Sequence, residues 1–438
     1  MKDDARPSVE IGELIDARPL TRLQVQVAVL CGLVVFFDGY DVQVMALAVP
    51  SVSESWGAAA SSFGIALSAS LLGIGLGSGL IGPFGDRIGR RPVIIGGLLL
   101  AGLATLATTL SHTLMDFTVW RLLTGLGIGA SIVNAAAHTS EYMPARRRSW
   151  LVTVMYCNVA LGAFFAGLLA PLVLRVTDWR GLFLLGGAGA LAACALAWAL
   201  LPESLKFLVA RRPGDPRIGV LLARLAPDVE PGSVFAAPRT AKKRSLMDLV
   251  NADYRARTAV LWTLYALNIF VIYVLMSWLP TLLRRAGWPT DEALVGAVLF
   301  QLGGVAGGLV LSSFIDRGRM RGALIVGYAT CAVALAALAF TPSTFLVWGA
   351  LMLAVGAGIS GAQFVLIALA AEFYPLTIRA TGVGWAVTIG RVGAVAAPLV
   401  GGAVLPLVTP VHALTLLMIP TLACAACAVL VRREWRDG

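Results

Sequence analysis

Long apolar segments alternate with polar stretches along most of the chain. Each apolar segment has about 18 residues or more, which is enough for a helix to cross the hydrocarbon core of a bilayer. The segments are residues 23–49, 60–83, 93–110, 116–138, 150–174, 181–201, 258–282, 293–314, 322–340, 344–371, 381–404 and 411–431. The pattern therefore predicts an all-α polytopic membrane protein with twelve transmembrane helices.

One polar stretch, residues 202–257, is much longer than the others and divides the predicted helices into two sets of six. It is rich in proline and in basic residues, as is typical of a linker. We expect a cytoplasmic N-terminal segment at 1–22, a six-helix bundle at 23–201, a cytoplasmic linker at 202–257, a second six-helix bundle at 258–431 and a cytoplasmic tail at 432–438.

The two sets of helices carry the same polar signals at a nearly constant spacing. Asp86 follows the second segment, and Asp316 follows the eighth. Glu141 follows the fourth segment, and Glu372 follows the tenth, so the two separations differ by a single position. The repeat predicts two pseudo-symmetric six-helix halves, an architecture of secondary transporters that bind their substrate between the halves near the membrane midplane.

Composition and charge fit this picture. The chain is 58% hydrophobic and 13% charged, whereas a soluble globular domain has about 25% charged residues. The net charge of +10 would suggest nucleic acid in a soluble domain. The predicted outer loops, however, hold only Arg175, Arg180, Arg284 and Arg285 of the 34 Lys and Arg. This asymmetry follows the positive-inside rule, so we expect both termini in the cytoplasm and no nucleic-acid partner.

The loop after the second segment carries a recognisable motif. It reads Gly82-Pro83-Phe84-Gly85-Asp86-Arg87-Ile88-Gly89-Arg90-Arg91. This loop resembles the cytoplasmic motif of the major facilitator superfamily, and the internal repeat extends the resemblance over almost the whole chain. The resemblance implies the major facilitator fold, alternating access, a multi-pass location in the bacterial inner membrane and function as a monomer in the lipid bilayer.

Four further motifs are similar to those of the aromatic acid:proton symporters of that superfamily. They are Phe37-Asp38-Gly39-Tyr40-Asp41, Arg121-Leu122-Leu123-Thr124-Gly125-Leu126-Gly127-Ile128-Gly129, Trp278-Leu279-Pro280 and Gly390-Arg391-Val392-Gly393. In contrast, Pro202-Glu203-Ser204 resembles the sugar porters. The resemblance to the symporters implies import of benzoate, a hydroxybenzoate, protocatechuate, gentisate or a related acid, with the proton as coupling ion and no cofactor.

Asp38 and Asp41 are candidates for proton binding. They are three residues apart, so both carboxylates lie on one face of the first helix, about 22 and 27 Å along it. Carboxylates at this depth are costly to ionise, and we expect at least one to bind a proton. Arg121 is expected at a similar depth, and the resemblance gives Asp41 and Arg121 the role of a coupling pair. The alternatives are a permanent ion pair for Asp41, a helix contact for Asp38 and snorkelling for Arg121.

Arg391 is the candidate ligand for a substrate carboxylate. It lies about 18 Å past Arg379 along the eleventh helix, near the midplane, and its planar guanidinium suits a carboxylate. An internal helix-pairing role is the alternative. An aromatic substrate also needs flat walls and a few hydrogen-bonding groups. For these groups we select Asn134, Tyr273 and Gln301, each of which is also a candidate for bundle packing.

Charged residues at the predicted cytoplasmic ends of both halves form candidate gates, in which ion pairs close and open as the transporter changes state. The set is Asp86, Arg90, Arg91, Glu141 and Arg148 in the first half and Asp316, Arg317, Glu372 and Arg379 in the second. His138, at the inner end of the fourth helix, is interpreted as a helix-end contact. The three histidines lack metal-ligand spacing, so we expect no metal site.

The sequence therefore favours a symporter that imports an aromatic carboxylic acid. The alternatives are a proton-coupled carrier of another organic acid, a sugar or an osmolyte and, less favoured, a drug efflux antiporter. Arg391 favours an anion over these other substrates. A zinc ligand set, a nucleophile elbow and a cofactor loop are all missing from the sequence, which argues against an enzyme. The duplicated halves argue against a channel.

Overall fold

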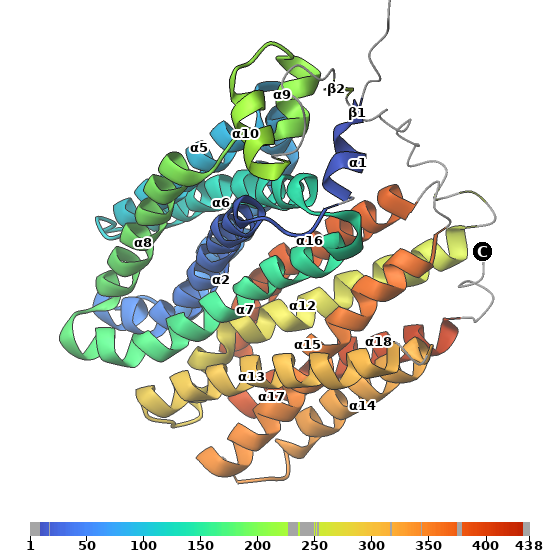
Figure 1. Ribbon diagram of the computed structural model, residues 1–438. Helices are drawn as coiled ribbons and strands as arrows, with labels where there is room; N and C mark the ends of the chain where they lie inside the picture. Colours follow the sequence, from blue (N-terminus) through green and yellow to red (C-terminus); the bar gives the residue numbers. More distant parts are fainter. Residues whose placement is uncertain are drawn as a thin grey trace, which may run out of the picture.

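The computed structural model describes residues 9–16, 18–226, 235–236, 249, 251, 254–315, 318–342, 344–374 and 379–431. Within these ranges the chain is almost entirely helical (Figure 1), apart from one short parallel pair of strands, β1 (Val9–Glu10) and β2 (Phe235–Ala236). In this described part, 12 helical segments are long and apolar enough to cross a membrane. The predicted all-α architecture with twelve spans is thus confirmed.

Six spanning segments form the first half of the molecule, which we call the N-half. They are α2 (Arg22–Trp56), α3 (Gly64–Leu76) with its continuation α4 (Gly85–Ile88), α5 (Arg90–Thr108), α6 (Leu114–Tyr142), α7 (Ala145–Val176) and α8 (Trp179–Leu200). Three shorter helices, α1 (Ile11–Asp16), α9 (Leu205–Arg211) and α10 (Arg217–Leu225), gather at one end of this half, the α9 end (Figure 1).

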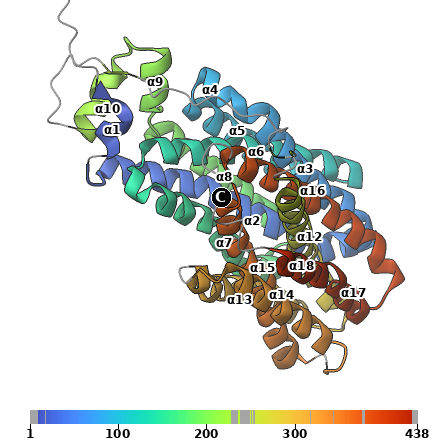
Figure 2. The ribbon, with the colours of Figure 1, turned by 90° about the vertical axis from the view of Figure 1, so that its right-hand side faces the viewer.

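The second half, the C-half, lies beside the first in both views of the ribbon (Figures 1 and 2). Its spans are α12 (Arg255–Arg285), α13 (Thr290–Ile315), α14 (Met320–Ala337), α15 (Phe345–Glu372), α16 (Arg379–Val404) and the pair α17 (Pro410–Leu416) and α18 (Met418–Leu430). Short 3-10 or π turns complete the spans at η1 (Ala60–Phe63), η2 (Gly77–Ile81), η3 (Gly82–Phe84) and η4 (Leu405–Leu407). We call the side of the molecule where α17 lies the α17 end.

The first spanning helix is longer than its apolar segment. α2 begins at a capping box, in which the side chains of Thr21 and Gln24 each accept a hydrogen bond from the other residue's backbone N–H. It continues through Pro50 and ends at Gly57, whose φ of 59° is left-handed. Glycine adopts this conformation without steric cost, so it terminates the helix where the proline does not. The sequence prediction placed the end at residue 49 because the apolar run stops there.

The internal repeat is visible in how closely the helices pack. A Cβ added to Gly73 on α3 would lie 2.3 Å from the carbonyl oxygen of Leu122 on α6. A Cβ added to Gly303 on α13 would lie 2.0 Å from the carbonyl oxygen of Leu353 on α15. Gly303 and Leu353 are the positions that correspond in the repeat to Gly73 and Leu122, so the same contact occurs in both halves. Only glycine permits helices to approach this closely.

Two other helix contacts repeat in the same way. A Cβ added to Gly162 on α7 would meet the Phe36 carbonyl on α2 at 1.9 Å, and one added to Gly393 on α16 would meet the Ala266 carbonyl on α12 at 2.2 Å. Gly97 against the Gly127 carbonyl repeats as Gly327 against the Gly358 carbonyl. Positions in α2, α3 and α5 therefore share the offset that separates Asp86 from Asp316, and those in α6 and α7 share the offset that separates Glu141 from Glu372.

The two halves are joined mainly toward the α17 end. One buried core combines residues 44–52 of α2 with helices of the C-half, whereas residues 23–35 of α2 belong to a second core with α9 and α10. The hydroxyl of Ser68 on α3 donates to the carbonyl of Val395 on α16 over 2.8 Å. Arg175 on α7 forms an ion pair with Asp291 on α13. The molecule is thus closed at the α17 end.

Candidate functional site

Asp41 and Arg121 form an ion pair inside the N-half. Arg121 Nη1 donates to Asp41 Oδ1 over 2.6 Å, and the side chains of Arg121 and Asp41 are 0% and 6% exposed, respectively. Asp41 comes from the middle of α2 and Arg121 from the second turn of α6. The structure therefore brings together the two residues that the sequence selected as a coupling pair, and Arg121 does not snorkel to an interface.

The remaining bonds of Arg121 come from groups that the sequence did not reveal. Its Nη2 donates to the hydroxyls of Thr105, Thr108 and Thr124 over 3.3, 3.1 and 2.7 Å. The guanidinium carbon also lies 5.0 Å from the ring centroid of Phe183. A buried charge requires several such partners because it has left water. We call Asp41 and these four residues the Arg121 cage.

The repeat shows that the Arg121 cage belongs to one half only. Arg121 corresponds to Met352, and Asp41 corresponds to Val271. The three threonines correspond to Leu335, Leu338 and Val355, and all five of these C-half residues are buried apolar side chains. Threonine is common in apolar helices and carries no signal by itself. A comparison of the two halves position by position is the sequence signal that would have found these residues.

Asp38 stands apart from the ion pair. It lies one turn before Asp41 on α2 and is 9% exposed, and its Oδ1 atom has no hydrogen-bond partner within the described residues. Its carboxylate interacts electrostatically with the guanidinium of Arg391 on α16 and, more weakly, with Asp41. The two aspartates therefore face different surroundings, Asp41 the interior of the N-half and Asp38 the C-half.

Arg391 is half-buried at the interface between the halves. Within the described part of the chain, its guanidinium has no hydrogen-bond or ion-pair partner. It interacts electrostatically with Asp38 and with the hydroxyls of Tyr156 and Tyr273. These four residues, which we call the central site, come from α2, α7, α12 and α16, two from each half. Arg391 and Tyr273 were both selected from the sequence, and the structure brings them into one site and adds Tyr156, which was not selected.

Two helices of the central site, α2 and α12, each carry a side-chain amide that is bonded to an amide on another helix. Gln301 on α13 donates to Gln43 on α2 over 3.4 Å and thus bridges the halves. Asn268 on α12 donates to Gln363 on α15 over 2.7 Å, and its Oδ1 atom has no partner in the described part. Gln301 therefore lies at the interface between the halves, and the sequence analysis missed its partner Gln43.

Asn134 requires a correction. Its Nδ2 group donates to the carbonyls of Gly82 and Ala130 over 3.1 and 2.9 Å, and its Oδ1 atom accepts from Arg90 over 3.4 Å. These bonds hold the side chain inside the N-half toward the α9 end, away from the central site. Asn134 lies on the face of α6 that is directed toward α4 and α5. We therefore do not include Asn134 in the proposed substrate site.

The charged residues at the α9 end form a network within the N-half. Arg90 pairs with Asp86 over 2.6 Å and with Glu141 over 3.1 Å. Glu203 accepts hydrogen bonds from the backbone N–H groups of Arg90, Arg91 and Ser204 over 2.9, 3.2 and 2.8 Å. Burial raises the pKa of Glu203 above its usual value, and these bonds partly offset the effect. Glu203 was noted only as part of a motif, and the structure adds it to this network.

The other predicted gate residues are placed differently. Arg148 pairs with Asp16 of α1 over 3.3 Å and does not contact Glu141, because α1 covers this part of the α9 end. The Arg91 guanidinium donates to the carbonyl of Trp198 on α8. Glu372 is the last residue of α15. Asp316, Arg317 and the side chain of Arg379 lie outside the described residues.

Comparisons with known proteins agree with this geometry. The sequence model of the Major Facilitator Superfamily matches residues 31–398 and 292–436. A gallate transporter of Pseudomonas putida is 37% identical in an alignment that covers 100% of this chain and 98% of the relative. A 4-hydroxybenzoate transporter of the same organism is 35% identical over 97% of this chain and 96% of the relative. The crystal structure of a D-xylose-proton symporter has a similar fold, with a TM-score of 0.70, 18% identity and coverage of 93% of this chain and 96% of that one.

Proposed function

The chain belongs to the Major Facilitator Superfamily, and on this basis we propose that it is a proton-coupled symporter that imports an aromatic carboxylic acid by alternating access. The substrate class is supported by the relatives, which transport gallate and 4-hydroxybenzoate, both aromatic carboxylates. The family consists of transporters, so the protein is a carrier and not an enzyme. It functions as a monomer in a bacterial inner membrane.

The single observation that carries the proposal is the guanidinium of Arg391, which lies at the interface between the halves and has no partner among the described residues. A guanidinium binds a carboxylate through two parallel hydrogen bonds, which fixes the orientation of the substrate as well as its charge. Tyr156 and Tyr273 supply flat apolar walls and hydroxyl groups beside it. Because no described protein group holds Arg391, a substrate binds it without first breaking a hydrogen bond.

Asp38 links substrate binding to protons. When ionised, its carboxylate is the counter-charge of Arg391 in the empty carrier. A substrate anion that binds Arg391 lies near this negative charge, and the repulsion between the two disfavours the complex. Protonation of Asp38 removes the repulsion. The substrate anion and a proton on Asp38 therefore bind more strongly together than separately, as symport requires.

The Arg121 cage supplies the second link. While Asp41 is ionised, its bond to Arg121 holds α2 against α6. Protonation weakens this bond, but the three threonines and Phe183 keep the guanidinium solvated in place. Protonation thus changes how strongly the helices of the N-half are held together without exposing an unsolvated charge. A proton that binds one conformation better than the other shifts the equilibrium between them.

We place the α9 end, with both termini, in the cytoplasm because the basic residues cluster there. On this assignment the structure, closed at the α17 end, faces inward. Arg90 is bonded to Asp86 and Glu141 within its own half in this state. When the cytoplasmic side closes, we propose that these side chains and their C-half counterparts exchange such bonds for contacts between the halves.

The charge balance limits the driving force. One proton that accompanies a monoanion moves no net charge, so only the pH gradient drives accumulation. A second proton adds about 2.3 kcal/mol for each 100 mV of membrane potential. Two carboxylates in different surroundings, those of Asp38 and Asp41, give the protein candidate sites for two protons.

Uptake measurements test the proposal. Cells that produce the protein are given radiolabelled benzoate, 3- and 4-hydroxybenzoate, protocatechuate, gentisate and gallate, with a sugar and a betaine as controls, and each is measured with and without a protonophore. We expect protonophore-sensitive accumulation of at least one aromatic acid and its loss in Asp41→Asn. Accumulation of the sugar or the betaine, with none of the acids, would contradict the proposal and the role of Arg391.

A further inference from the structure

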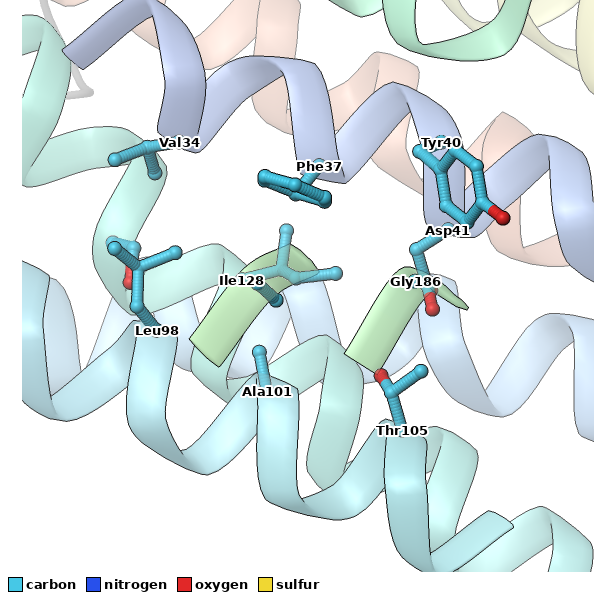
Figure 3. A pocket seen from close by; sticks show the side chains of 11 residues that line it. Val34, Phe37, Tyr40, Asp41, Leu98, Ala101, Thr105, Ile128 and Gly186 are labelled. Carbon is cyan, nitrogen blue, oxygen red and sulfur yellow. The ribbon is translucent and has the colours of Figure 1, made fainter. Parts of the chain in front are cut away.

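A small cavity lies inside the N-half, beside the Arg121 cage. It has a volume of about 20 Å³ and is enclosed by α2, α5, α6 and α8. Figure 3 shows Asp41, Tyr40 and Thr105 at one end of it and Val34 and Leu98 at the other. A cavity of this size holds about one or two water molecules if polar groups line it. The polar groups here are the side chains of Asp41, Tyr40, Thr105 and Ser131.

Asp41 offers this cavity an unused acceptor. Its Oδ2 atom is buried and has no hydrogen-bond partner within the described residues, whereas Oδ1 is bonded to Arg121. The ion pair is also shielded from solvent, since Arg121 is fully buried and Asp41 is 5% exposed. A proton that leaves Asp41 in this state crosses buried surroundings, and the cavity is the space that adjoins Asp41 in the N-half.

One face of α6 continues from the cavity toward the α9 end. Thr124, Ile128, Ser131, Ala135 and His138 follow each other at intervals of three or four residues, so they lie on one face of the helix. Ser131 lines the cavity, and His138 lies about 10 Å beyond it along the helix. The small side chain of Ala135 occupies the turn between them, where α2 contributes Cys31 close to Thr139.

His138 is the next titratable side chain on this face. It is fully buried, and neither ring nitrogen makes a hydrogen bond of ordinary geometry within the described part of the chain. The polar groups that interact with its ring are the Arg90 guanidinium and the Pro202 carbonyl, and the centroid of the Tyr142 ring lies 5.1 Å away. Arg90 in turn reaches Asp86, whose side chain is 60% exposed. A buried imidazole that is held by no hydrogen bond of ordinary geometry and lies next to an exposed charged group is suited to pass a proton on.

The C-half lacks this line of polar groups. Thr105, Ser131 and His138 correspond to Leu335, Ala362 and Leu369, which are all buried. A role in helix packing alone would be needed equally in both halves, because the helix contacts repeat. The polar line occurs only in the half that holds the ion pair, which ties it to the chemistry of Asp41.

We propose that Asp41 exchanges its proton with the cytoplasm through the interior of the N-half, by way of water in this cavity and His138, so that proton and substrate leave by separate routes. The inference rests on the proposed symport. In the inward-facing state the O–H bond of Asp41 breaks, and its proton passes to cavity water. The proton then moves over water along this face of α6 to one ring nitrogen of His138, and the other ring nitrogen releases a proton to water beside Arg90 and Asp86. The carboxylate left behind pairs with Arg121, which is the arrangement seen in the structure.

Two substitutions block this route at different points. Ala101 lines the cavity from α5 (Figure 3), so Ala101→Leu fills it, whereas the matched control Ala101→Ser keeps the space and adds a polar group. His138→Gln keeps a hydrogen-bonding side chain that cannot carry a proton at neutral pH. Each variant is reconstituted in vesicles and assayed for accumulation of the labelled acid driven by a pH gradient, and for exchange of labelled against unlabelled acid without a gradient. Exchange does not require Asp41 to lose its proton.

We expect Ala101→Leu and His138→Gln to accumulate the acid at a rate about tenfold or more below that of the wild type. Exchange by both variants, and both activities of Ala101→Ser, are expected to stay near the wild-type level. Normal accumulation in either blocking variant would overturn the route. So would a parallel loss of accumulation and exchange, since that result indicates a structural role. A wild type that exchanges no aromatic acid would instead refute the proposed function.

Discussion

Asp38 on α2 and Arg391 on α16 interact electrostatically across the interface between the halves, and within the described residues no hydrogen bond joins them. Opposite charges at an interface usually form a bonded pair, as Arg175 and Asp291 do at the α17 end. The separation at the central site leaves both groups available, Arg391 for an anion and Asp38 for a proton. Each group can be tested by itself.

Replacement of Arg391 by lysine keeps the charge but removes the planar pair of donors. We expect Arg391→Lys to raise the KM for the aromatic acid about tenfold or more, because hydrogen bonds to charged groups are worth about 1.5–3 kcal/mol. Initial rates of uptake over a range of substrate concentrations give the value. Arg175→Lys, on the exposed surface at the α17 end, is the control and should leave KM unchanged. An unaltered KM in Arg391→Lys would argue for a helix-pairing role.

The two aspartates are expected to behave differently. Asp38→Asn removes the charge that competes with the substrate for Arg391, so the apparent KM should fall by about threefold to tenfold. Asp41→Asn should abolish accumulation and preserve exchange, because a neutral amide mimics the protonated acid permanently. Exchange and gradient-driven uptake, measured side by side for both variants, separate these effects. The opposite pattern, with accumulation lost in Asp38→Asn and kept in Asp41→Asn, would show that Asp41 carries no coupling proton.

The threonines around Arg121 can be tested through stability. Thr124→Val keeps the shape of the side chain and removes the acceptor that lies 2.7 Å from Nη2. Loss of one hydrogen bond to a buried charge should lower the free energy of unfolding by about 2 kcal/mol. Thermal denaturation of the purified protein measures the change. Thr118→Val, on the same helix and bonded to the backbone carbonyl of Leu114, should have a much smaller effect.

Glu203 makes a specific contribution to the pH dependence of stability. Burial raises its pKa in the folded protein, so the folded state binds a proton at this site more tightly than the unfolded state. Stability from this group is therefore highest below its unfolded pKa and decreases as the pH rises through the raised value. As the pH rises through the raised pKa of Glu203, the thermal midpoint of the wild type should therefore decrease relative to that of Glu203→Gln. A difference that stays constant with pH would contradict this assignment.

The membrane spans were predictable because a run of apolar residues long enough to cross a bilayer has few other uses. The pairing of Asp41 with Arg121 was predictable for a related reason, since a buried charge needs a partner at its own depth. Asn134 was misassigned because one sequence does not reveal which face of α6 is directed toward the other half. The pairing of Arg148 with Asp16 depends on how α1 folds back over the bundle, and hydropathy carries no information on that contact.

The ends of the spans and the Arg121 cage needed the structure. α2 continues through Pro50 and ends at the left-handed glycine at position 57, whereas hydropathy marks only the end of the apolar run. Thr105, Thr108 and Thr124 resemble any other threonines of an apolar helix until their hydroxyls are seen around one guanidinium. The helix contacts align the two halves of the repeat. Only this alignment shows that the three threonines have apolar counterparts in the C-half.

The unequal chemistry of the two halves has a consequence for how such a carrier changes in evolution. The ion pair and its cage lie wholly within the N-half, while the C-half supplies Arg391, Tyr273 and Gln301 to the proposed substrate site. Substitutions on α12 and α13 can thus alter the proposed substrate contacts and leave the Asp41–Arg121 pair untouched. A carrier built in this way can change its selectivity in one half while the other half keeps its buried ion pair.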